Sequence, residues 1–163
     1  MPEDSDCESD PLIEIIINCD GWQKLDFEPM AKAQEIIKSV LKEFEDANGA
    51  IDVLLTDDGE IRELNKKWRN IDKPTNVLSF EHIGANDILG DIAISLSYCQ
   101  KEAENQNKNL KNHFTHLLVH GTLHLLGYDH INEVEAQEME NLERDILAKM
   151  GISDPYILGD ING

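Results

Sequence analysis

Hydrophobic positions along the chain form short runs in some segments and a helical spacing in others, and together they predict a mixture of strands and helices. Short runs rich in β-branched residues predict strands at residues 12–18, 50–56, 77–80 and 89–95. Apolar positions that recur every three or four residues predict helices at 28–49, 60–68, 97–105, 110–126 and 132–151. We therefore expect an α+β fold: a single domain in which helices pack on a mixed sheet of about four strands.

Residues that favour helix ends mark four of these boundaries. Pro29 near the start and Gly49 at the end fit the usual asymmetry of helix termini. An aspartate of the Asp57–Gly59 turn is expected to cap the helix that follows it. Asn132, with Glu135 three residues later, is typical of a helix start.

The pattern also divides the chain into a domain and two tails. Residues 1–11 are too polar to join a core, so we expect a flexible acidic tail there. Residues 12–156 carry the periodic segments and form the expected domain. Residues 157–163 are expected to be a C-terminal tail.

The charge of the chain argues at first against a nucleic-acid partner. The 163 residues include 14 Lys and Arg against 33 Asp and Glu, a formal net charge of −19. However, residues 1–61 and 131–163 carry all of that excess, and residues 62–130 are neutral. Exposed charges are screened beyond roughly 8–10 Å at physiological salt. The middle of the chain is therefore not excluded from binding RNA.

Cysteines and hydropathy indicate the compartment. Three cysteines without a C-x-x-C spacing predict neither a disulfide framework nor a thiolate metal site. The first residues lack the pattern of a signal peptide, and no apolar run approaches the roughly 20 residues of a membrane span. We expect a soluble, cytoplasmic protein with no membrane partner.

Five of the six histidines lie between residues 113 and 130, and three of them predict a metal site. His120 and His124 are four residues apart on a predicted helix, so their rings project from the same face. His116 is disfavoured as a third ligand, because it lies about 12 Å from His124 along the helix axis. Gly127 can end the helix in a left-handed conformation and bring His130 back over the site.

The resulting H-x3-H-x2-G-x2-H spacing favours catalytic over structural metal binding. Three imidazoles suit Zn²⁺, with nickel or copper also possible by ligand softness alone. Three protein ligands leave a fourth position for water, so the predicted class is metal-assisted hydrolysis. His113 and His116 are instead expected to make ordinary hydrogen bonds.

The same spacing matches the metzincin protease motif H-E-x-x-H-x-x-G-x-x-H, with one departure. The glutamate that serves as general base in that motif is replaced here by Gly121. A protease without it has no evident group to activate water. Peptide hydrolysis is therefore a weaker hypothesis, although it stays open.

A second segment, residues 64–80, combines basic residues with an aromatic one. Lys66 and Lys67 are expected to form a solvated helix face, and Trp68 to fill the core. Arg69 lies where the helix gives way to a proline-containing loop, and its guanidinium matches phosphate oxygens. Arg69 is therefore the candidate catalytic residue of this segment.

Three motifs together give the chain a family resemblance. They are L-N-x-x-W-R-x-x-D-x-P-T-N-V-L-S-F at 64–80, L-G-D-I-A-I-S at 89–95 and H-G-x-L-H-L-L-G-Y-D-H at 120–130. Over residues 12–156 the sequence resembles the YbeY family of bacterial endoribonucleases. The resemblance implies a zinc-dependent, single-strand-specific RNase acting in rRNA maturation, notably at the 16S 3′ end, and in ribosome quality control.

Carried over residue by residue, the resemblance implies one Zn²⁺ bound by His120, His124 and His130. Arg69 would face the scissile phosphate, and single-stranded or ribosomal RNA, the ribosome and ribosomal proteins would be partners. Asn76 stands where the family commonly has Asp, and Trp68 where Tyr is common. Any role for a carboxylate at position 76 is therefore lost in this chain.

Two other functions stay open from the residues alone. The first is a metalloprotease or amidase, suggested by the metzincin-like spacing. The second is a non-catalytic module of the ribosome in which zinc only fixes the C-terminal turn, with Asp129 filling the fourth position. The general base, the cleavage site and the oligomeric state are not predicted.

Overall fold

A four-stranded mixed sheet forms the centre of the protein in the computed structural model, which describes residues 12–44, 47, 49–82 and 87–156. Its strands are β1 (Ile13–Ile17), β2 (Ala50–Thr56), β3 (Val77–Glu81) and β4 (Ile88–Ser95). Their order is β1-β2-β4-β3. Strands β1, β2 and β4 are parallel, and β3 runs antiparallel to β4 at one edge. The predicted α+β class and mixed sheet are confirmed.

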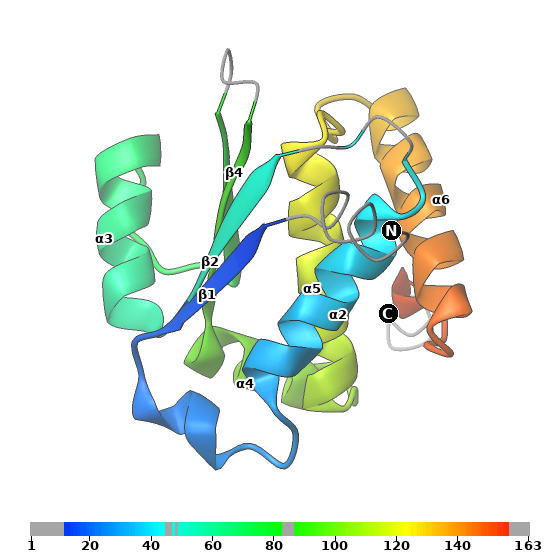
Figure 1. Cartoon of the computed structure of the whole chain (residues 1–163). Helices are drawn as coiled ribbons and strands as arrows, with labels where there is room; N and C mark the ends of the chain where they lie inside the picture. Colours follow the sequence, from blue (N-terminus) through cyan, green and yellow to red (C-terminus); the bar gives the residue numbers. More distant parts are fainter. Residues whose placement is uncertain (1–11, 45–46, 48, 83–86, 157–163) are drawn as a thin grey trace, which may run out of the picture.

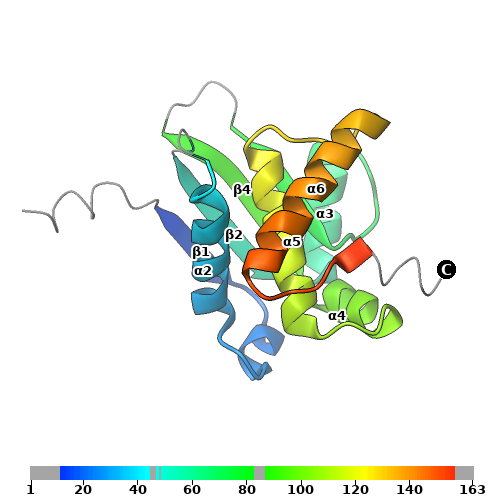
Figure 2. The same cartoon turned by 90° about the vertical axis from the view of Figure 1, so that its right-hand side faces the viewer.

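Five α-helices and one short 3₁₀ helix pack around this sheet in the described residues. They are η1 (Asp20–Lys24), α2 (Pro29–Leu41), α3 (Asp58–Arg69), α4 (Leu96–Asn105), α5 (Leu110–Leu125) and α6 (Glu133–Lys149). Helices α2 and α5 cover one face of the sheet, and α6 packs outside α5 (Figures 1 and 2). Helix α3 lies alone on the opposite face (Figure 1). The protein thus has three layers, and helices cover one face of the sheet more fully than the other.

The main core lies between the sheet and the α2–α5 layer. Alternate residues of β2, Ile51, Val53 and Leu55, point into this core, as their near-zero exposure shows. A second, smaller cluster lies under α3, where Ile61 contacts Leu78 and Ala93. The sheet therefore has buried residues on both of its faces.

The first long helix is shorter than its periodicity predicts. Helix α2 begins at Pro29 as expected, but it ends at Leu41 rather than near Gly49. Turns follow, in which the Phe44 backbone N–H donates to the Leu41 carbonyl. Because these turns keep Phe44 packed against the core, the apolar spacing continues beyond the end of the helix. Gly49 instead adopts φ 132° just before β2, close to the Leu89 backbone.

An aspartate of the predicted turn occupies the N-cap position of α3, but its side chain does not cap the helix. Helix α3 begins at Asp58, two residues earlier than expected, and its N-cap Asp57 makes no capping hydrogen bond with its side chain. Asp57 Oδ1 instead accepts the backbone N–H of Ser97 at 2.9 Å, at the start of α4. Burial raises the pKa of Asp57, but the bonds from Ser97 outweigh it and lower the value. The predicted cap of α6 is confirmed, because Asn132 accepts the Glu135 backbone N–H.

Three further features concern the two predicted tails, a helix that was not predicted, and membrane spans. The predicted tails, residues 1–11 and 157–163, lie outside the described residues. Sequence periodicity did not predict η1, whose Trp22 is fully buried and donates to the Thr56 carbonyl at 2.8 Å. Within the described ranges, no helix is both long and apolar enough to cross a membrane.

Candidate metal centre

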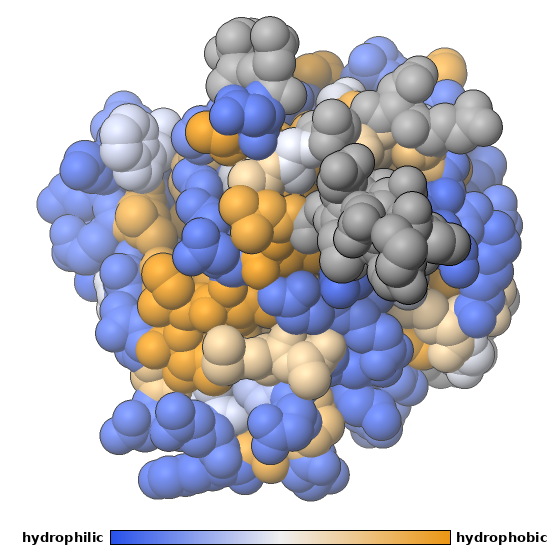
Figure 3. All heavy atoms as spheres, viewed as in Figure 1, coloured by the Kyte–Doolittle hydropathy of each residue, from blue (hydrophilic) through white to orange (hydrophobic). Residues whose placement is uncertain are grey.

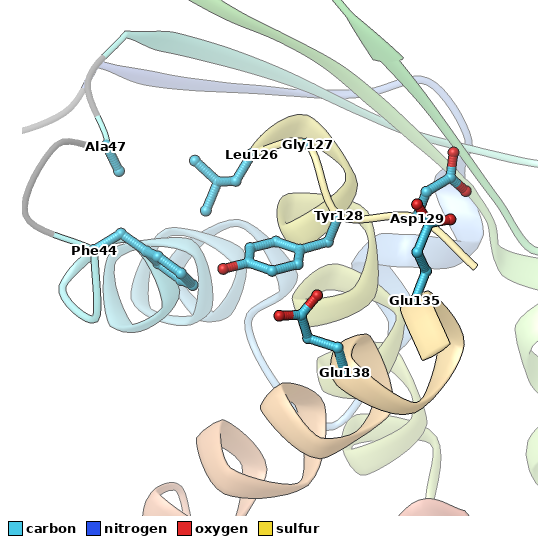
Figure 4. A pocket seen from close by; sticks show the side chains of 8 residues that line it. All are labelled: Phe44, Ala47, Leu126, Gly127, Tyr128, Asp129, Glu135 and Glu138. Carbon is cyan, nitrogen blue, oxygen red and sulfur yellow. The ribbon is translucent and has the colours of Figure 1, made fainter. Parts of the chain in front are cut away.

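The end of α5 turns sharply and brings His130 beside the helix. Gly127 adopts φ 101°, as the sequence predicts, and its N–H donates to the His124 carbonyl. Tyr128 then packs against Phe44, with ring centroids 5.9 Å apart. Figure 4 shows this arrangement, in which Tyr128 points toward Phe44 and Asp129 points the other way. The aromatic contact anchors the turn and directs the next residues toward the opposite side.

His120, His124 and His130 meet at this turn. One ring nitrogen from each lies within 4.8 Å of the other two. The Nε2 atoms of His120 and His124 are 3.1 Å apart. Two imidazoles bound to one zinc at about 2.0–2.1 Å place their nitrogens at about this separation. The group could therefore hold a metal ion.

The electrostatics of the site favour a neutral imidazole at His124, the form that binds metals. Burial, together with the positive charges of His120 and His130, lowers the pKa of His124 to about 4. His124 is therefore uncharged at neutral pH. Three imidazoles this close would repel one another if all were protonated, whereas a cation between them would be attracted to all three lone pairs.

A buried carboxylate behind the histidines fixes the orientation of His120. Glu143 of α6 has an exposed fraction of 0%. Its Oε2 lies 2.8 Å from Nδ1 of His120, and its Oε1 lies 2.7 Å from Nε2 of His116. An ionised carboxylate only accepts hydrogen bonds, so His120 donates through Nδ1 and presents its Nε2 lone pair to the site.

Glu143 is ionised despite its burial. Burial would raise the pKa of Glu143, but the hydrogen bonds from His116 and His120 outweigh that effect and lower it to about 2. The hydroxyl of Tyr156 donates to Glu143 Oε1 at 2.5 Å. Burial and the Glu143 charge raise the pKa of Tyr156, which keeps this donor protonated.

Sequence reasoning missed Glu143 and Tyr156 as parts of the site. Tyr156 lies in the segment after α6 for which no element was predicted. The expected hydrogen-bonding role of His116 is confirmed by its bond to Glu143, and that of His113 by a 2.9 Å bond to Glu102. Neither belongs to the group of mutually close ligand atoms found in the described residues.

Gly121 explains why the metzincin glutamate is absent. Its face of α5 is buried against the sheet, and a Cβ atom there would lie 3.1 Å from Ser79 Oγ and 3.4 Å from Ile92 Cγ2. A glutamate side chain at this position would have to enter the contact between α5 and the sheet. Gly121 therefore lets α5 pack closely on the sheet and does not take part in catalysis.

Arg69 shares a cleft with the three histidines. The cleft has a volume of about 410 Å³ and is also lined by Asn76, Ser79, Glu81 and Asp129. Helix α3 ends at Arg69, and the next residue, Asn70, adopts φ 60° and reverses the chain. The guanidinium donates to the Ser79 carbonyl at 2.5 Å and lies 5.0 Å from the centroid of the Phe80 ring. These two contacts hold an exposed cation at the edge of the cleft.

Of the other predictions for residues 64–80, one is confirmed and one is wrong. Lys66 and Lys67 are exposed, as expected. Trp68 is not a core residue, because 61% of it is exposed. Asn76 lies in the cleft, where its side-chain amide donates to Glu102 at 3.0 Å.

Comparisons with known proteins identify the family of the chain. The family model described as Endoribonuclease YbeY matches residues 16–151, which include all four predicted site residues. The chain belongs to the YbeY family. The "Endoribonuclease YbeY" of Novosphingobium aromaticivorans is 43% identical over 93% of this chain and 99% of its own length. That of a Bradyrhizobium strain is 45% identical over 90% of this chain and 92% of its own length.

A solved structure supports the fold of this YbeY family member. The solution structure of TM1509 from Thermotoga maritima aligns with a TM-score of 0.54 and 25% sequence identity. The alignment covers 85% of this chain and 91% of the other chain. The shared architecture therefore extends over nearly the whole α+β domain.

Proposed function

We propose that the protein is a zinc-dependent, single-strand-specific endoribonuclease. The observation that supports this most strongly is the convergence of three histidine nitrogens within 4.8 Å, in a cleft that Arg69 also lines. The family relatives carry the printed name endoribonuclease. The proposed roles are metal ligands for His120, His124 and His130, and a catalytic cation for Arg69.

The residues of the site fit a zinc ion. Three imidazoles with one buried carboxylate behind them are a common donor set of catalytic zinc sites. Bound zinc would supply a Lewis acid for activating water and polarising a phosphoryl oxygen. Glu143 orients His120 for binding, and the turn at Gly127 places His130 opposite the helix.

Arg69 has the chemistry for charge stabilisation on a phosphodiester. A guanidinium presents five N–H donors, and the Ser79 carbonyl accepts from one terminal nitrogen. The remaining donors can bind phosphoryl oxygens as negative charge develops on them. The stacking on Phe80 keeps the group in place without neutralising it.

Two carboxylates of the cleft are candidates for the general base. Glu81 and Asp129 line the same cleft as the histidines. Asp129 Oδ1 accepts the backbone N–H of His130 at 2.8 Å, which commits one of its oxygens to the turn. Glu81 is exposed at the end of β3, where a water molecule can reach it. We therefore favour Glu81 for proton transfer.

The biological setting follows from the family resemblance. We propose rRNA maturation at the 16S 3′ end and ribosome quality control as the process, in the cytoplasm, with the ribosome or its proteins as partners. We also propose residues 12–156 as the functional domain, with residues 1–11 and 157–163 as tails. Because the chain carries a net charge of −19, its intrinsic affinity for bare RNA should be weak.

The experiment that tests the proposal compares substrates under metal control. The purified protein is incubated with a single-stranded RNA, with the same RNA as a duplex, and with an unfolded protein, each with and without chelator. We expect cleavage of the single strand alone, its loss with chelator and its recovery when zinc is restored. Chelator-sensitive cleavage of the unfolded protein would instead favour a metalloprotease. Failure to cleave any substrate, with zinc bound, would favour a structural zinc site.

A further inference from the structure

Strand β3 has one paired side and one free side. It is an outer strand of the sheet and pairs with β4 in the antiparallel direction. The backbone N–H of Ser95 donates to the Asn76 carbonyl at 3.0 Å, and that of His82 donates to the Leu89 carbonyl at 3.1 Å. In an antiparallel pair, residues bonded to the partner strand alternate with residues whose backbone groups point away from it. The backbone groups of residues 76, 78, 80 and 82 therefore face β4, and those of 77, 79 and 81 face away.

The outward-facing backbone groups of β3 lie at the histidine cleft, because Val77, Ser79 and Glu81 all line it. Two of these groups have partners. The Ser79 carbonyl accepts from the Arg69 guanidinium at 2.5 Å, and the Val77 N–H donates to Asn76 Oδ1 at 2.6 Å. For the Ser79 N–H, the part of the chain that the structure describes provides no acceptor. This N–H is therefore an unused donor in the cleft.

The unused donor lies between the guanidinium and the metal-binding helix. A Cβ atom on Gly121, the residue after His120, would lie 3.1 Å from Ser79 Oγ, so Ser79 packs against α5 beside the first proposed ligand. The N–H and C=O of one residue in a strand point to the same side. Arg69, bound to the Ser79 carbonyl, is therefore also next to the Ser79 N–H. The two residues together present a group of adjacent donors.

The two edges of the sheet offer different chemistry. Hydrophobic side chains gather beside α3, over the part of the sheet where β1 and β2 lie (Figure 3). Ile16 of the outer strand β1 is 59% exposed. At the β3 edge, in contrast, a guanidinium and a backbone N–H are available to an anion. Glu81 and Asp129 also line the cleft, so an anion there needs donors that hold it on the Arg69 side.

We propose that the backbone N–H of Ser79 donates, together with Arg69, to the phosphodiester of the RNA substrate. A phosphoryl oxygen is a charged acceptor, and its hydrogen bond to an N–H strengthens as negative charge develops on it. The sheet fixes the position of this N–H, so the donor needs no rearrangement during the reaction. The inference rests on the proposed function and adds a catalytic group to it, one that no side chain supplies.

An extended peptide is the other ligand that a free strand edge can bind, by adding a strand to the sheet. Such a strand would pair with both the N–H and the C=O of Ser79. Arg69 already occupies the Ser79 carbonyl, so the added strand would lose a bond in the middle of the edge. A phosphate needs only the N–H and gains the guanidinium. The contact of Arg69 therefore favours the phosphate.

The first test follows backbone amides of the zinc-loaded protein by nuclear magnetic resonance. The probe is uridine 5′-monophosphate, which carries a phosphate but has no internal phosphodiester to cleave, and uridine is the control without phosphate. We expect the monophosphate to shift the Ser79 amide proton downfield and uridine to leave it in place. The Leu78 and Phe80 amides, which face β4, are internal controls and should move much less.

The second test removes the donor. Ser79→Pro lacks the N–H, and because this N–H points away from β4, a proline at the edge should be tolerated. Ser79→Ala loses the same hydroxyl but keeps the N–H. With zinc bound, Ser79→Pro should cleave RNA about 100-fold more slowly than Ser79→Ala, mainly through the single-turnover rate. Leu78→Pro removes a bond to β4 instead and should unfold at a lower temperature than Ser79→Pro.

Four results would overturn the inference. The first is a Ser79 amide that does not respond to saturating monophosphate. The second is an equal cleavage rate in folded Ser79→Pro and Ser79→Ala. The third is unfolding of Ser79→Pro, which would show that its N–H belongs to the β3–β4 pair. The fourth is an extended peptide that shifts the Ser79 and Glu81 amides when the monophosphate shifts neither.

The two tests also separate this inference from the proposed function. If the monophosphate shifts the Ser79 amide and the protein cleaves no RNA, the phosphate contact stands and the proposed function is wrong. If the protein cleaves RNA and the Ser79 amide stays unchanged, the proposed function stands and this inference is wrong.

Discussion

Glu143 Oε2 and His120 Nδ1 lie 2.8 Å apart, and this contact joins α6 to the proposed metal ligands. Glu143 is fully buried, and it reaches the site from a position 23 residues after His120. The contact fixes which nitrogen of His120 carries the proton. The orientation of a ligand thus depends on the packing of α6 against α5.

Glu143→Gln should lower zinc affinity by about 10–100-fold while the protein stays folded, because an amide nitrogen cannot accept a hydrogen bond from His116 or His120. Competition with a chromophoric chelator measures the affinity, and circular dichroism checks the fold. The exposed Glu138→Gln on the same helix is the matched control and should bind zinc like wild type. Unchanged zinc affinity in folded Glu143→Gln would show that this carboxylate does not position His120.

Gly121→Glu should destabilise the protein by several kcal/mol and should not create peptidase activity, because the added side chain enters the contact between α5 and Ser79. Thermal unfolding measures the loss. Gly59→Glu is the control, since no atom lies within 4 Å of a Cβ placed there. That variant should be as stable as wild type. A stable Gly121→Glu protein would mean that α5 packs less closely on the sheet than described.

Arg69→Ala should keep zinc and fold but reduce the cleavage rate by about 100- to 1,000-fold, the range seen when one charge-stabilising donor is removed. Arg69→Lys should recover only part of this loss, because an ammonium lacks the planar fork of donors. Single-turnover cleavage and zinc content are measured together. Lys67→Ala, two positions earlier on the same exposed end of α3, should retain most activity. If Arg69→Ala loses zinc or unfolds, the residue is structural.

Glu102 provides a pH-dependent contribution to stability away from the histidine ligands. Burial raises its pKa, but hydrogen bonds from His113 and Asn76 outweigh burial and lower it, helped by the charges of His113 and Lys108. A carboxyl with a lowered folded-state pKa stabilises the fold above its ordinary value of 4.5. That stabilisation disappears as the pH falls through the lowered value.

Glu102→Gln should therefore be less stable than wild type by about 1 kcal/mol at pH 7, with the difference vanishing in acid. The glutamine can keep the acceptor oxygen that His113 and Asn76 share, so the comparison isolates the charge. Urea unfolding at a series of pH values measures it. A difference that stays constant down to strongly acidic pH would contradict the assignment.

The features that could be predicted from the sequence are those that depend on residues close to one another along the chain. His120 and His124 are one helical turn apart, and Gly127 is the residue that permits the turn to His130, so short-range spacing was sufficient to find the group. The strands were likewise found because each is a short run rich in β-branched residues. The end of α2 was missed because Phe44 keeps the apolar spacing beyond the last helical residue.

Features that depend on packing were not predicted. Glu143 lies on the buried face of α6 with Met139, Ile146 and Leu147. A charged residue among these apolar positions was the one sequence feature that indicated a buried carboxylate with a polar partner. Tyr156 comes after α6 and offered no periodicity. Trp68 has the helical spacing of a core residue, seven positions after Ile61, but the end of α3 leaves it uncovered.

The most direct test of the central claim measures zinc per chain and RNA cleavage in the same preparations of wild type and His124→Ala. The account predicts one zinc ion and cleavage of single-stranded RNA for wild type, and the loss of both for the folded variant. The contradicting result is a His124→Ala protein that lacks zinc and still cleaves the RNA at the wild-type rate.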